Sequence, residues 1–162
     1  MTVFKFYKLI FLGFALVPSM VYADASITIR PQAGYGYMNA SNSDNSGGIA
    51  HVGVRALLNA SEIRRYGLEL SKLSMDGGKD FTSFGIVLEQ RLWGWFNMSI
   101  GTVGYFDYGE NSENPVGLIT NLGWEPSHYK TFKPFITFRN DVIFSNDTDT
   151  VQSLSIGMSL EF

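Results

Sequence analysis

The 162-residue chain contains no cysteine, so neither a disulfide nor a thiolate metal site can stabilise it. Its two histidines, His51 and His128, do not stand at the spacing of a zinc site. The chain also has no Gly-rich phosphate loop and no heptad repeat. From residue 24 onward, no apolar run reaches the roughly 18 residues expected of a membrane-spanning helix. The fold must therefore rest on hydrogen bonds and packing.

Residues 1–23 have the layout of a secretory signal peptide. Two lysines precede an apolar run, Leu9–Val17, which Pro18 ends, and small residues stand before the expected cut after Ala23. An uncleaved membrane anchor is the alternative, but it would need roughly 20 apolar residues. We therefore expect one mature domain, residues 24–162.

The mature domain is acidic. Loss of Lys5 and Lys8 lowers the basic residues from 12 to 10 against 15 acidic ones, which gives a net charge of −5. Nucleic-acid binding relies on a basic surface, so we expect no nucleic-acid partner.

Eight segments of the mature domain alternate apolar and polar residues with a period of two, which predicts β-strands. Each is about 9–14 residues long, enough for a tilted strand to cross a bilayer. The segments are Ser26–Met38, Ile49–Asn59, Arg65–Met75, Phe81–Arg91, Trp95–Tyr108, Val116–Trp124, Phe132–Phe144 and Val151–Phe162.

The two faces of these segments differ in a way that indicates a membrane. In the last one, Leu154, Ile156 and Met158 share one face, and serines occupy the other. Apolar-out and polar-in faces suit a cylinder in lipid, whereas a soluble barrel would show the reverse. The sequence therefore predicts an all-β, eight-stranded, antiparallel, up-and-down transmembrane barrel. Pro31 lies inside the first strand, where we expect a bulge or a later strand start.

Turn residues and aromatics fit this arrangement. The connections after the odd-numbered strands are rich in Asn, Asp, Ser and Gly, and Asn39–Gly48 is the longest. An even number of strands places both termini on the periplasmic side. Aromatic residues form two expected girdles at the strand ends. They are Tyr35, Tyr37, Phe106, Tyr108 and Phe144 at the outer ends, and Tyr66, Trp93, Trp95, Trp124, Phe132 and Phe162 at the periplasmic ends.

With these features the mature region resembles the small eight-stranded barrels of the bacterial outer membrane, of the OmpX, Ail and OmpA-barrel type. The sharpest motif is a C-terminal assembly signal, matched by Ser155, Gly157, Leu160 and Phe162. The resemblance implies a Gram-negative outer-membrane protein, porin-like in its cell-envelope location. It also implies contact with outer-membrane lipid and lipopolysaccharide, recognition by the assembly machinery, and a monomeric state.

A narrower resemblance links the seventh strand to lipid A deacylases of the PagL type. These enzymes carry a His-x-Ser-Asn stretch there, and Ser145 and Asn146 match its last two positions. Ile143 stands at the histidine position, and Gln152 stands near that of the acid. A serine needs a neighbouring base to act as a nucleophile, and Ser145-Asn146 also reads as a turn.

Charged residues are expected inside the barrel in two groups. The group nearer the periplasm is Arg30, Arg55, Glu69, Glu89, Arg91, Lys133 and Glu161. Because an eight-stranded barrel is just wide enough for side chains to fill it, we expect a salt-bridge plug, with a gated ion path or proton relay as the alternative.

The second group, nearer the outside, is His51, Asp107, Arg139 and Asp141. It could be an acid–base pair, a metal site or a satisfied lumen histidine, and we favour the last. We expect no metal and no cofactor.

Three functions follow from these patterns. The first is a barrel with a filled lumen and a structural or surface-interaction role, without catalysis or a wide pore. The second is a PagL-type acyl hydrolase that acts on lipid A at the outer leaflet, with Ser145 or His51 as weak catalytic candidates. The third is a small pore. We favour the first.

Overall fold

The computed structural model describes residues 26–41, 46–109, 113–126, 132–145 and 148–162, so the expected signal peptide lies outside the described residues. These ranges contain eight strands. They are β1 (Ile27–Asn39), β2 (Gly47–Asn59), β3 (Arg64–Met75), β4 (Phe81–Trp93), β5 (Phe96–Phe106), β6 (Val116–Trp124), β7 (Phe132–Phe144) and β8 (Thr148–Glu161). No helix in the described ranges is long and apolar enough to span a membrane.

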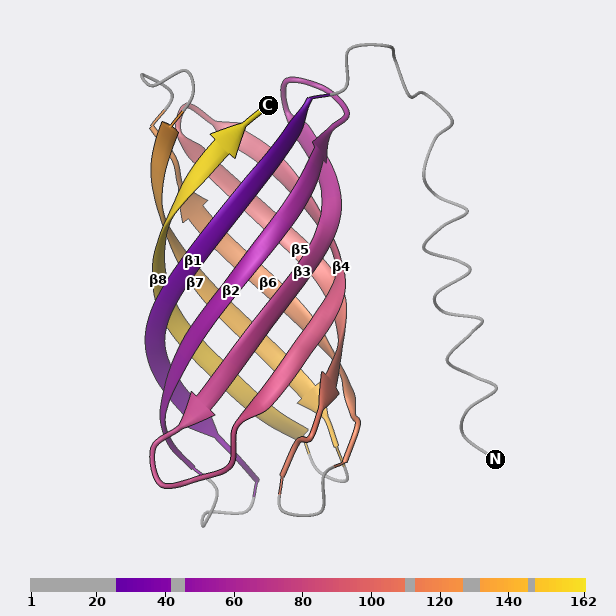
Figure 1. Cartoon of the computed structure of the whole chain (residues 1–162), viewed down its shortest axis with the longest axis vertical. Helices are drawn as coiled ribbons and strands as arrows, with labels where there is room; N and C mark the ends of the chain where they lie inside the picture. Colours follow the sequence, from indigo (N-terminus) through magenta and orange to yellow (C-terminus); the bar gives the residue numbers. More distant parts are fainter. Residues whose placement is uncertain (1–25, 42–45, 110–112, 127–131, 146–147) are drawn as a thin grey trace, which may run out of the picture.

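Each strand pairs antiparallel with the next along the chain, and β1 also pairs with β8. The sheet is thus a closed barrel, which confirms the fold predicted from the alternating segments (Figure 1). The beginning of β1 and the end of β8 lie at one end of the barrel, called here the termini end. The opposite end is called the far end. Closure leaves no free sheet edge.

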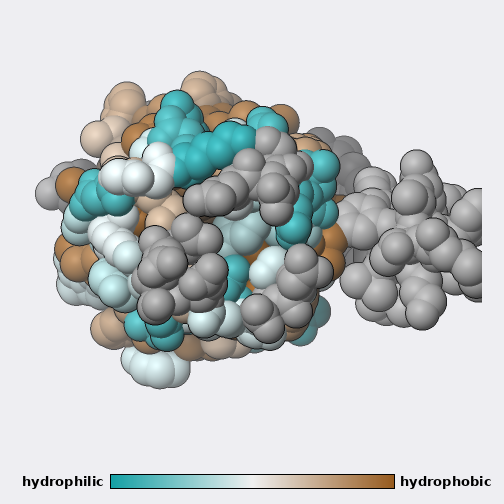
Figure 2. Space-filling model, turned by 90° about the horizontal axis from the view of Figure 1, so that it is seen from below, coloured by the Kyte–Doolittle hydropathy of each residue, from teal (hydrophilic) through white to brown (hydrophobic). Residues whose placement is uncertain are grey.

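Outward and inward residues differ as the alternation predicts. On the outside, Val52 is 63% exposed and Ile156 is 64% exposed. On the inside, the charged side chains of Glu69 and Arg139 are fully buried. Seen from the far end in Figure 2, hydrophilic residues gather on the face, and hydrophobic residues show at its margins.

The expected bulge at Pro31 is wrong. β1 begins at Ile27, before the proline, and pairs with β2 in unbroken register, Pro31 opposite Val54 included. On the other side, pairing with β8 lapses at Arg30 and Pro31 and resumes at Gln32 without a register shift. Because proline has no N–H, it removes a ladder bond without inserting a residue.

The far half of the interior is more apolar than the alternation predicts. Phe81, Tyr105 and Tyr108 pack with ring centroids 5.1–6.2 Å apart. Tyr108 is only 6% exposed, so its expected place in the outer aromatic girdle is wrong. Buried aliphatic residues surround these rings in one cluster, and the rings close the far half of the lumen by packing. The cluster includes Met38, Ile49, Leu73, Ile143 and Val151.

Candidate functional site

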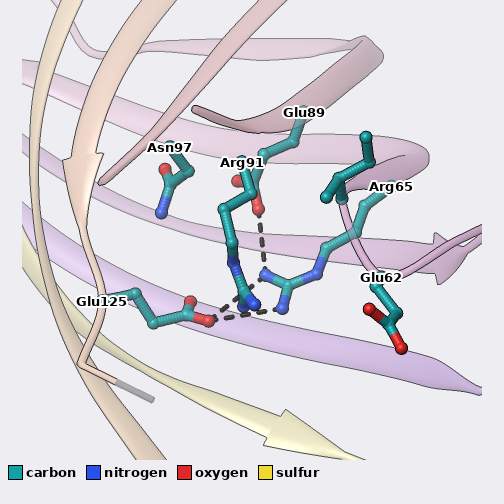
Figure 3. A pocket seen from close by; sticks show the side chains of 7 residues that line it. Glu62, Arg65, Glu89, Arg91, Asn97 and Glu125 are labelled. Atoms are coloured by element: carbon teal, nitrogen blue, oxygen red, sulfur yellow. Dashed lines mark hydrogen bonds and ion pairs between the residues drawn. The ribbon is translucent and has the colours of Figure 1, made fainter. Parts of the chain in front are cut away.

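Charged residues from several strands gather inside the barrel at the termini end (Figure 3). Arg30 on β1 pairs with Glu89 on β4, and its guanidinium also lies 3.1 Å from Glu125, which follows β6. Arg65 on β3 joins the same two carboxylates, at 2.9 Å from Glu89 and 3.3 Å from Glu125. Ser159 on β8 donates a hydrogen bond of 2.7 Å to Glu125. We call these five residues the mouth network.

The mouth network controls the charge of Glu125. Burial opposes the ionised carboxylate, but Arg30 and Arg65 favour it more strongly, so the pKa of Glu125 lies below its ordinary value. Two arginines and two glutamates thus balance inside one closed group. Such pairing is what makes buried charge tolerable.

A small cavity of about 10 Å³ lies beside this network, with Glu62, Arg91 and Asn97 around it. That volume holds at most about one water molecule. The Arg91 backbone N–H donates to the Ile63 carbonyl at 2.8 Å, which ties the β2–β3 turn over the mouth. The termini end is therefore filled by side chains.

A second ionic group crosses the middle of the lumen. Arg55 on β2 pairs with Glu69 on the adjacent β3 at 2.5 Å. From β7, the Arg139 guanidinium forms one ion pair with Glu69 and another, at 2.7 Å, with Asp141. The Tyr105 hydroxyl donates a 2.8 Å hydrogen bond to the Asp141 carboxylate. We call these five residues the central network. Because Glu69 bonds both its neighbour and a strand across the barrel, the group fixes the barrel's cross-section.

His51 lies against this central network with both ring nitrogens engaged. Its Nδ1 is 3.1 Å from Ser155 Oγ, and its Nε2 is 3.0 Å from Ser71 Oγ and 2.9 Å from Arg139 Nη1. A guanidinium nitrogen can only donate, so Nε2 accepts and Nδ1 carries the proton that Ser155 accepts. This assignment leaves no lone pair on His51 for a substrate.

A hydrogen-bonded cluster seals the far end. Tyr108 donates a 2.6 Å hydrogen bond to Asp149, which also accepts from the Ser41 backbone N–H at 2.8 Å and from the Ser145 hydroxyl at 3.2 Å. Burial and the bond to Asp149 raise the pKa of Tyr108 above its ordinary value. The Ser145 hydroxyl thus shares the Asp149 carboxylate with the Tyr108 phenol.

The structure distributes the residues of the expected inner charge cluster over three groups. Arg30 and Glu89 belong to the mouth network, and Arg55 and Glu69 belong to the central network. The single cluster expected from the sequence is thus wrong in its membership.

The other three members of that expected cluster lie apart from both networks. Lys133 and Glu161 form a separate pair at the termini rim, 2.7 Å apart. Arg91 lines the mouth cavity, and it forms no ion pair with the part of the chain that the structure describes. Of the expected outer group, Asp107 is exposed in a turn with a φ of 59° and does not join His51.

Sequence reasoning missed four residues of the two networks: Arg65, Glu125, Tyr105 and Ser159. Each had a signal in the alternation, because odd-numbered residues of β3, β5 and β8 point inward, and Glu125 continues the inward parity of β6. Arg65 and Glu125 stand at the ends of these segments, where a strand boundary is hardest to assign. His128 lies outside the described residues. Within the described ranges, no group of His, Asp and Glu could hold a metal ion.

Comparison with known proteins identifies the fold. No protein-family model matches the chain, and no curated protein sequence matches it. The crystal structure of Neisserial surface protein A matches 84% of this chain and 97% of its own, with 13% identity and a TM-score of 0.65. The chain therefore shares the fold of that small barrel.

Two further structures match at lower scores. Ail of Yersinia pestis, in complex with the heparin analogue sucrose octasulfate, matches 85% of this chain and 99% of its own, at 11% identity and a TM-score of 0.46. The outer membrane protein OprG from Pseudomonas aeruginosa matches 85% of this chain and 96% of its own, at 11% identity and a TM-score of 0.43.

Proposed function

We propose that the chain is an integral β-barrel of the Gram-negative outer membrane, monomeric, with both termini in the periplasm and a structural or surface-interaction role. The observation that carries this is the exposed apolar outer wall. Leu70, Ile100 and Phe138 are 47–49% exposed around the cylinder. Large exposed apolar surfaces are unfavourable in water and favourable in lipid.

The interior supports a filled barrel over a pore. The mouth network, the central network and the aromatic cluster follow one another along the barrel axis, and their side chains are buried except for the partly exposed Arg65. An eight-stranded barrel is narrow enough for such side chains to occupy its lumen. We therefore expect no steady ion conductance.

The far end would face the cell exterior, with the sheet ends held by the Tyr108–Asp149 bond. Its connections would meet lipopolysaccharide or external ligands. The longest connection, Asn39–Gly48, lies partly outside the described residues. At the other end, the motif Ser155, Gly157, Leu160 and Phe162 would be read by the assembly machinery during insertion.

The deacylase alternative rests on the match of Ser145 and Asn146 to two positions of the motif. Ser145 donates to Asp149, and the histidine of the described ranges, His51, is bound inside the barrel to Ser71, Ser155 and Arg139. The position of the family histidine is Ile143, which is fully buried. Acyl transfer by a serine uses a base such as imidazole to take up the hydroxyl proton, whereas the Ser145 hydroxyl donates to the Asp149 carboxylate. We therefore favour the filled barrel over the hydrolase.

Cell fractionation tests the proposal. The mature protein should appear in the outer membrane and migrate faster on gels without heating than after boiling. A soluble periplasmic protein with unchanged migration would contradict the membrane placement.

Two measurements separate the alternatives. Lipid A from cells that carry Ser145→Ala should match that from wild-type cells by mass spectrometry, and a changed acyl pattern would favour the hydrolase. Purified protein in planar bilayers should show no discrete conductance steps. Steps that change with Glu89→Ala or Arg55→Ala would favour the pore.

A further inference from the structure

The outer wall carries a broad apolar hollow, of about 690 Å³, over β1, β7 and β8. Its lining residues include Pro31, Ala33, Trp124, Pro134, Ile156 and Met158, and none of its lining residues is charged. The hollow is shallow and open to the outside of the barrel.

Small and compact residues create this hollow. Ala33 lies in register between Val52 and Ile156, both more than 60% exposed, so a short side chain stands between two prominent ones. Gly53 and Gly157 pair with Gln32 on its two sides, in the next row of the register. Both face inward and contribute only backbone to the outer surface.

The same region has a weakened hydrogen-bond ladder. Pro134 lies opposite Met158 on the β7 side, and on the β1 side the pairing with β8 lapses at Arg30 and Pro31. Each proline removes one backbone donor from the sheet. In hydrocarbon a backbone group without a hydrogen-bond partner is costly, so this stretch is a weak point of the wall.

The hollow lies in the half of the barrel nearer the termini end. Pro31 is the fifth residue of β1, and Trp124 is the last residue of β6 at that end. The Trp124 ring packs against Trp95 with centroids 5.8 Å apart. Paired tryptophans at a strand end are typical of the membrane interface, so this edge would lie at the headgroup level.

We propose that one acyl chain of a periplasmic-leaflet phospholipid occupies this hollow, with its headgroup beside Trp95 and Trp124. The proposal rests on the membrane placement and orientation given under the proposed function. Val54, Leu154 and Phe138 around the hollow are apolar and exposed, which suits contact with an acyl chain. Lipid A would approach from the opposite leaflet, away from this half of the barrel.

The test compares a variant that fills the hollow with a control variant that carries the same substitution elsewhere on the wall. Ala33→Trp places a large ring in the hollow, and Ala56→Trp makes the same change at another outward position of the wall. Wild type and both variants are inserted into vesicles of phosphatidylethanolamine and phosphatidylglycerol that also contain lipid A. They are then extracted in mild detergent, and their bound lipids are weighed by native mass spectrometry.

Wild type and Ala56→Trp should retain one phospholipid, and Ala33→Trp should retain several-fold less. Equal retention by all three proteins would overturn the proposal, as would selective retention of lipid A. A dimer that Ala33→Trp disrupts would assign the hollow to a second copy of the chain and also overturn it. If Ala33→Trp does not fold, Ile136→Trp, which also fills the hollow, replaces it.

The test separates this proposal from the membrane placement. Failure of the wild type to insert into the vesicles, or to show heat-modifiable migration, would overturn both. If the wild type inserts but retains no more phospholipid than Ala33→Trp, the acyl-chain proposal alone is overturned.

Discussion

The backbones of Ile27 and Phe162 exchange two hydrogen bonds, from Ile27 N–H to Phe162 O at 3.1 Å and from Phe162 N–H to Ile27 O at 2.9 Å. They join the beginning of the sheet to its end and so close the cylinder. The Phe162 side chain, in contrast, is 76% exposed and packs little. The backbone and the ring of this residue thus have separable roles.

Phe162→Ala should separate these roles. Because the ring is exposed and the backbone bonds remain, the free energy of unfolding should change by less than about 0.5 kcal/mol in denaturant titrations of refolded protein. If the assembly machinery reads the ring, the amount of folded protein in outer membranes should fall several-fold. Phe106→Ala, an exposed ring on β5, is the control and should leave both quantities unchanged. Equal membrane levels in both variants would contradict recognition of Phe162.

Arg139→Met should destabilise the barrel strongly, because it leaves Glu69 and Asp141 buried without their shared partner. Removing one partner of a buried ion pair typically costs about 3–5 kcal/mol. Lys72→Met, which breaks the exposed Lys72–Asp80 pair, should cost less than about 1 kcal/mol. Urea unfolding in detergent micelles measures both, and equal losses would contradict a structural role for the central network.

Acid should weaken the mouth network through Glu125. Since the pKa of Glu125 in the folded protein lies below its ordinary value of 4.5, the stabilisation is present above that value and lost as the pH falls below it. Between about pH 6 and about pH 3, wild type should therefore lose more stability than Glu125→Gln, which cannot titrate. Unfolding midpoints across this range measure the difference. Parallel pH profiles would show that Glu125 does not carry the effect.

Tyr108→Phe should loosen the far end of the barrel. The variant removes the 2.6 Å bond to Asp149, and a buried hydrogen bond to a charged group contributes about 1.5–3 kcal/mol. Tyr37→Phe changes an exposed ring on β1 and should have an effect within about 0.5 kcal/mol. Amide exchange at the ends of β5 and β8 should speed up only in Tyr108→Phe. Similar exchange in both variants would contradict the seal.

The strands could be predicted because their information is local. In β8, serines alternate with Leu154, Ile156 and Met158, and the structure places the serines inside and the apolar residues outside. Most predicted boundaries agree with the structure within about two residues, and β8 begins three residues earlier than expected, at Thr148. After Thr148 the strand continues through Asp149, and the hydrogen bond from Tyr108 offsets the cost of burying the Asp149 carboxylate.

The partners of the inward charges could not be predicted in the same way. Alternation shows that Glu69 and Arg139 both face the lumen, but the two are 70 residues apart in the chain. Their contact depends on the stagger of strands around the cylinder, which no local pattern encodes. Asp107 and Tyr108 changed places for a different reason. β5 ends at Phe106 and Asp107 has a φ of 59°, so the strand alternation stops there, the predicted site residue is exposed, and the predicted girdle residue is buried.

The sequence alone determined that eight strands alternate between an apolar and a polar face, because a residue's face in a strand depends only on its position parity. It also determined that charges of both signs face inward in numbers that can balance. Only the tertiary structure decided which charges meet, that Tyr108 seals the interior, and that two prolines and Ala33 leave a hollow in the wall. These depend on the closure and stagger of the barrel, which bring residues distant in sequence to the same depth.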